Sequence, residues 1–154
     1  METTTAKSFL AHQQSGSPTA LAELVAALRP ERARARARGL FGAARGFALA
    51  RLAHELNRPL VCVEPGEEAA EALEQDLRFF LGSEEKTLPV VRLPADETLP
   101  YEGLTPDRLV AQQRLAALFR LHLRGEARPV VIFSVRSLAR RVLPRPALDG
   151  RSLL

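Results

Sequence analysis

An early stretch of the chain has the spacing of a phosphate-binding loop without its chemistry. A P-loop reads G-x-x-x-x-G-K-[ST]: backbone N–H groups surround the phosphates, the lysine reaches the terminal ones and the hydroxyl holds Mg²⁺. In the segment GLFGAARG, Gly39 fits the first position and Gly42 keeps the turn rich in glycine. Ala44, Arg45 and Gly46 stand where the second glycine, the lysine and the hydroxyl residue belong, so three of the four defining positions have changed.

Each replacement removes one property of a nucleotide site. Ala44 adds a Cβ where the backbone must approach phosphate closely. The long planar guanidinium of Arg45 does not replace a compact ammonium group. Gly46 supplies no hydroxyl for the metal. We therefore predict no catalytic residue, no cofactor and no metal ligand here. Two alternatives stay open: a glycine-containing turn that matches by chance, and a working ATP site in which Arg45 replaces the lysine.

Composition points to one ordinary soluble domain. The chain has 154 residues, 46% of them hydrophobic and 26% charged, and a formal net charge of +4. Its single cysteine, Cys62, excludes a disulfide framework and a cysteine-based zinc site, and the histidines are scattered. No apolar stretch approaches the roughly 18 residues of a membrane span, and the first residues are not organised as a signal peptide. We expect a cytoplasmic protein with no membrane partner.

A basic run precedes the loop. Arg32, Arg34, Arg36 and Arg38 alternate with alanines, which places the arginines on one face of an extended chain. We favour an exposed edge strand, because no aromatic residue is interleaved as a stacking platform for nucleic acid bases. A basic patch that contacts DNA phosphates is the alternative.

Apolar periodicity predicts alternating helices and strands, which defines an α/β fold with a mainly parallel sheet. We expect a flexible N-terminal segment over 1–18, an α/β domain over 19–145, and the start of a linker or next domain over 146–154. The first predicted helix begins at 17–19 and ends by Pro30, and the fourth runs from 105–107 to Gly125. The other predicted helices cover 47–56, 67–81 and 135–143. The predicted strands are 33–40, 60–63, 88–93 and 129–134.

Several single residues have competing interpretations. Glu64 follows a strand, but Glu67 and Glu68 come next, so we favour a solvated acidic helix start over a metal ligand. Ser134 ends a buried strand without a basic partner, so it has no nucleophile triad. One apolar stripe is expected to pack in the core rather than to dock a partner; its members are Leu109, Leu115, Leu118 and Phe119.

Four blocks then agree in order with a known family: RGLFGAARGFALARLA, RPLVCVEPGEEAAEALEQDLRFFLG, LPADETLPYEGLTPDRLVAQQRLAALFRL and RPVVIFSVRSLARRVLP. Together they resemble the N-terminal domain of the bacterial transcription-repair coupling factor (Mfd). The block from Asp96 to Tyr101 is the most specific. The resemblance implies a three-layer, parallel-sheet, P-loop-like fold similar to the first domain of UvrB, with a degenerate phosphate loop.

The resemblance also implies a function. Family members recognise stalled RNA polymerase, displace it with an ATP-driven motor on duplex DNA, and recruit UvrA mainly through a domain that adjoins this one. ATP and Mg²⁺ belong to that motor, whose motifs are absent from these residues. We therefore expect a non-catalytic scaffold that supports UvrA recruitment and contacts other domains of the same protein. Glu97 and Tyr101 form a candidate contact loop, or only fix the loop's shape.

Overall fold

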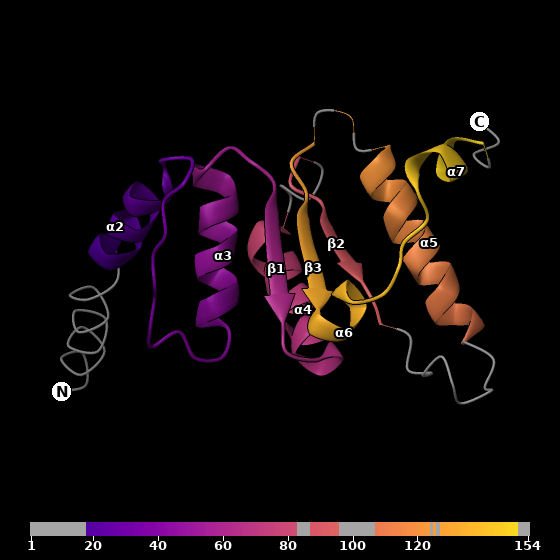
Figure 1. Cartoon of the computed structure of the whole chain (residues 1–154). Coiled ribbons are helices and arrows are strands. Elements are labelled where there is room, and N and C mark those ends of the chain that lie inside the picture. Colours follow the sequence, from indigo (N-terminus) through magenta and orange to yellow (C-terminus); the bar gives the residue numbers. More distant parts are fainter. Residues whose placement is uncertain (1–17, 83–86, 96–106, 124, 126, 151–154) are drawn as a thin grey trace. The chain divides into compact units, whose positions relative to one another are not determined.

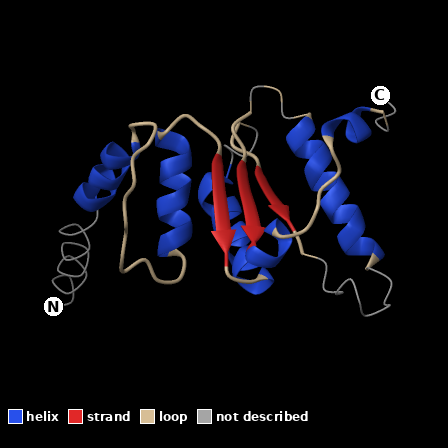
Figure 2. Ribbon diagram, in the orientation of Figure 1, coloured by secondary structure: helices blue, strands red, loops and turns tan. Residues whose placement is uncertain are grey.

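The computed structural model describes residues 18–82, 87–95, 107–123, 125 and 127–150. The chain divides into two compact units, Met1–Phe41 and Gly42–Leu154. Figure 1 follows the chain through its helices and strands, and Figure 2 separates the two kinds of element by colour. Each unit is described by itself.

The first unit contains helix α2 (Pro18–Leu28), which ends just before Pro30 as predicted. Residues 33–41 form neither helix nor strand, so the strand predicted over 33–40 is wrong. Alternation in this run sets arginine against alanine, and alanine offers little apolar area to bury. Both sets of side chains from Arg34 to Arg38 are exposed. The pattern had the period of a strand but not the burial that holds one in place.

The second unit is built around three parallel strands, β1 (Leu60–Glu64), β2 (Val90–Leu93) and β3 (Val130–Ser134), in the order β1-β3-β2 (Figure 1). The three short apolar runs behave as predicted, and the α/β class with a parallel sheet is confirmed. Leu60 and Val90 both pair with Val130, which sets one register across the sheet.

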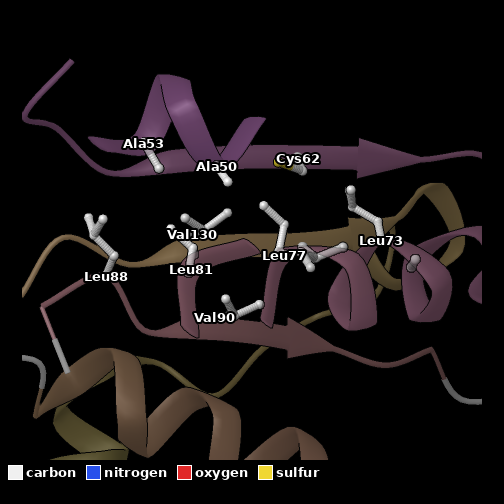
Figure 3. Packing of buried hydrophobic residues seen from close by; sticks show 11 residues of the cluster. Ala50, Ala53, Cys62, Leu73, Leu77, Leu81, Leu88, Val90 and Val130 are labelled. Carbon is white, nitrogen blue, oxygen red and sulfur yellow. The ribbon is translucent and has the colours of Figure 1, made fainter. Parts of the chain in front are cut away.

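One face of this sheet carries the larger hydrophobic core. Helices α3 (Ala44–Glu55) and α4 (Glu67–Leu81) pack here, with α4 in contact with all three strands. Figure 3 shows small residues of α3, long leucines of α4 and inward-facing strand residues meeting in one layer. The buried members of this core are Ala50, Ala53, Cys62, Ala70, Leu73, Leu77, Leu81, Leu88, Val90, Val130 and Ile132.

Helices α3 and α4 end at the predicted stop signals. Asn57, just after α3, has a left-handed φ of 53°, a conformation that asparagine adopts more readily than most residues. Gly82 has φ 47° and ends α4 at the predicted position. The described residues contain no helix long and apolar enough to cross a membrane.

On the opposite face, α5 (Arg108–His122) packs over β2 and β3. Asp107 caps this helix, and its carboxylate accepts a hydrogen bond from the Leu109 N–H at 2.7 Å. The prediction for the apolar stripe is only partly right, because Leu109 and Leu115 are exposed. The contact with the sheet is made instead by Ala117, Leu118 and Leu121, which pack against Val91, Leu93 and Phe133.

Two short helices end the described chain. Helix α6 (Val135–Leu138) is shorter than the helix predicted over 135–143. Helix α7 (Arg145–Asp149) lies largely within the stretch assigned to a linker or next domain. It packs on α5: Leu148 is buried, and Asp149 Oδ1 lies 2.7 Å from Nε2 of His122.

Candidate functional site

The segment GLFGAARG forms a turn that enters a helix, as predicted, but no strand precedes it as a P-loop requires. Gly42 has a left-handed φ of 53°, and α3 begins at Ala44. Gly39 also has a positive φ, of 79°. A working loop connects the end of a strand to a helix N-terminus, whereas residues 33–41 form no strand. The described residues therefore contain the turn and the helix but not the full supporting motif.

Arg45, at the position of the P-loop lysine, is held by an internal carboxylate. Its Nη1 lies 2.9 Å from Oε2 of Glu64, at the end of β1. The Glu64 side chain is only 7% exposed, whereas that of Arg45 is 41% exposed. The prediction of a solvated Glu64 is therefore wrong, because an arginine from the first turn of α3 reaches this carboxylate and allows its burial. A buried carboxylate needs such a partner. Here Glu64 pairs with Arg45, which is the cation that a phosphate would need.

Gly46, at the position of the metal-binding hydroxyl, is required by packing. It is buried, and a Cβ placed on it would lie 2.4 Å from Cβ of Asp76 on α4. That atom is fixed to the α4 backbone, so it cannot move aside by a change of rotamer. A serine or threonine therefore has no room at position 46. The sequence indicated only a missing hydroxyl; it contained no sign of this helix contact.

The buried thiol of Cys62, two residues before Glu64, is unreactive. The pKa of Cys62 is raised from an ordinary 9.0 to about 11, chiefly by burial and also by the Glu64 carboxylate, while the Arg45 guanidinium acts to lower it. The thiol is therefore neutral at physiological pH. Since the thiolate is the reactive form, Cys62 is not a nucleophile here.

The remaining predicted residues do not gather into a second site. Arg32, Arg34, Arg36 and Arg38 are exposed in the first unit, and Glu97 and Tyr101 lie outside the described residues. Ser134 has a structural role, since its Oγ accepts a hydrogen bond from the Ser137 N–H at 2.9 Å and caps α6. Within the described ranges, no group of three or more histidine, cysteine or acidic side chains could hold a metal ion.

Fold and site together define an α/β domain with a parallel sheet and an altered loop at the start of a sheet-packed helix. The chain is 53% identical over 113 residues to a transcription-repair-coupling factor of Myxococcus xanthus, and 30% identical over 115 residues to one of Escherichia coli (strain K12). The family resemblance carried by the four sequence blocks is thereby confirmed.

These matches cover 72% and 75% of this chain but only 9% of each relative, so the chain corresponds to a small segment of a coupling factor. No family model matches the chain. No solved structure matches it either.

The contact at Gly46 gives a stability prediction. Gly46→Ala should lower the free energy of unfolding by about 1–3 kcal/mol, because the added methyl group overpacks the contact between α3 and α4. Elsewhere within a helix the same change gains about 0.5–1 kcal/mol. Chemical denaturation monitored by circular dichroism measures the difference.

Gly66→Ala is the matched control, because nothing lies within 4 Å of a Cβ at Gly66; it should cost less than about 1 kcal/mol as a helix cap. Asp76→Gly in the Gly46→Ala background should recover part of the loss. Equal stability of the two alanine variants would refute the packing argument.

The buried thiol gives a pH prediction. Because the folded pKa of Cys62 lies above its ordinary value, the thiol's contribution to stability is complete below about pH 9 and is lost as the pH rises towards 11. Titration of the thiolate by ultraviolet absorbance should show Glu64→Gln lowering this pKa and Arg45→Gln raising it. An unshifted thiol in the folded chain would contradict the assigned surroundings.

Proposed function

We propose that this chain is a non-catalytic scaffold domain of a transcription-repair coupling factor, with a P-loop-like fold similar to the first domain of UvrB. In the whole protein it would support the recruitment of UvrA, mainly by the adjoining domain. The sequence identity to two coupling factors supports the family assignment. Contacts with RNA polymerase and duplex DNA, and the ATP and Mg²⁺ of the motor, would belong to other parts of the whole protein.

One observation carries the non-catalytic assignment: Arg45 pairs with the buried Glu64. A triphosphate in this loop would have to displace Glu64 from Arg45 and leave that carboxylate buried and unpaired beside the phosphates. Both changes cost free energy, because an unpaired buried charge is expensive and like charges repel most strongly where water is excluded. The packed Gly46 also leaves no hydroxyl for Mg²⁺.

The proposal predicts that Mg·ATP does not bind at micromolar concentrations. Isothermal titration calorimetry on the chain should show no saturable heat, and ATP turnover should be absent. Glu64→Gln, which frees Arg45 from its partner charge, should still fail to restore binding because residue 46 lacks a hydroxyl. Micromolar affinity in the unaltered chain, abolished by Arg45→Ala, would instead establish the alternative of a working ATP site.

A scaffold also needs surfaces for other domains, and the sheet supplies one. On β1, Val61 and Val63 are 65% and 51% exposed, on the face that α5 covers over β2. Both faces of parallel sheets are ordinarily covered. Val135 and Leu138, in the helix that directly follows β3, are exposed as well. We infer that another domain of the coupling factor covers Val61 and Val63.

Lysine at both positions tests this surface. Val61→Lys with Val63→Lys should change the unfolding free energy of the isolated chain by less than about 1 kcal/mol, since both side chains are exposed. In the whole coupling factor the same pair should weaken UvrA recruitment, measured by surface plasmon resonance, because it disturbs a domain contact. Phe79→Lys, at an exposed phenylalanine of α4, is the control. Equal UvrA binding by the valine pair and this control would reject the surface.

A further inference from the structure

A second polar site lies at the opposite edge of the sheet from Arg45. Between α4 and α5, beside β2, the chain forms a cavity of about 330 Å³. The sheet order β1-β3-β2 places β2 at the edge away from β1 and Glu64. The cavity is lined by Glu74, Arg78, Val91, Arg92, Pro94, Gln113, Ala116, Ala117 and Arg120.

Two of its three arginines are held in place by glutamates. Glu74 bridges them, with Oε1 lying 3.0 Å from Nη2 of Arg78 and Oε2 lying 2.6 Å from Nε of Arg92. Glu67 Oε2 lies 3.3 Å from Nη1 of Arg92. Arg78 Nη2 also donates to the carbonyl of Val90, at 3.4 Å, on the free edge of β2. This network fixes the guanidinium of Arg92 before any ligand arrives.

The third arginine, Arg120, adds a positive charge that the two glutamates do not balance. Two glutamates balance Arg78 and Arg92, whereas Arg120, in the last turn of α5, makes no hydrogen bond or ion pair within the described part of the chain. The Nη2 group of Arg92 likewise has no acceptor among the described residues. Apolar groups of Val91, Pro94 and Ala117 form part of the wall.

We propose that this cavity binds the phosphate group of a small molecule, with Arg120 and the fixed Arg92 as its donors. A guanidinium presents paired N–H groups that match two phosphate oxygens, and such charge-assisted hydrogen bonds are stronger than neutral ones. The cavity volume suits a phosphate with a small attached group. This site is separate from the degenerate loop, so its outcome does not depend on the absence of ATP binding there.

The test is a titration of the chain with inorganic phosphate at constant ionic strength, followed by ¹H–¹⁵N chemical shifts. The amides of Gln113, Ala116 and Ala117 should shift saturably. Arg120→Gln should weaken binding about 10-fold or more, the effect of losing hydrogen bonds to a charged group. Arg108→Gln, at an exposed arginine in the first turn of the same helix, is the matched control and should bind as the unaltered chain does.

A second variant tests the cavity itself. Ala116 is exposed at its rim, so Ala116→Leu should fill part of the space and weaken phosphate binding while leaving the fold unchanged. Shifts that rise linearly with phosphate, or equal affinities of the Arg120→Gln and Arg108→Gln variants, would overturn the proposal. Binding that Ala116→Leu leaves intact would also overturn it, since the ligand would then lie outside the cavity.

Discussion

The structure of the second unit depends on the close packing of α4. Leu73 and Leu77 are fully buried, and the helix contacts all three strands as well as α3. Helix α3 meets it with small residues, Ala50 and Ala53, in the shared core. Small side chains let two helix backbones approach closely, and at Gly46 there is no room for a Cβ beside Asp76. The P-loop hydroxyl would have to stand at this contact, so close helix packing and metal binding require different residues at one position.

The charged residue in the first turn of α3 is likewise used within the protein. Arg45 carries the positive charge that a phosphate site needs, but its guanidinium pairs with Glu64. Glu64 is buried at the end of a sheet strand, and it needs the arginine more than a solvated carboxylate would. Burial also raises the pKa of the Cys62 thiol, two residues before Glu64. At the β2 edge the charges are not balanced in this way. Two arginines pair with two glutamates there, and the charge of Arg120 has no such partner among the described residues.

The sequence predicted best where a strong period met a clear stop signal. Helix α4 has the predicted bounds, Glu67–Leu81, because an acidic first turn, a leucine stripe and Gly82 all indicate the same element. The strand predicted over 33–40 failed because alternation alone does not show whether a face will be buried. Leu109 was misassigned for the same reason, since only the placement of α5 on the sheet shows which side of the helix faces inward.

The sequence predicted which P-loop residues are missing from the candidate site, but not the contacts made by the residues that replace them. Single positions showed the missing lysine and hydroxyl, whereas the Arg45–Glu64 pair and the Gly46–Asp76 contact join residues about one helix or more apart in the chain. Such contacts depend on how helices and strands cross, which local patterns do not encode. The arginines of the β2 cavity likewise come from α4, β2 and α5, and nothing in their spacing predicted that they would meet.

The uneven covering of the sheet follows from these contacts and bears on the proposed scaffold role. The larger core, between the sheet, α3 and α4, does not include Val61 or Val63. Burying those two valines against another domain would add apolar contact at about 25 cal/mol per Å² without rearranging that core. A domain with its own core and one open apolar strand face can therefore bind and release a neighbouring domain while remaining folded. That is the physical requirement for the proposed scaffold, and it does not require nucleotide binding.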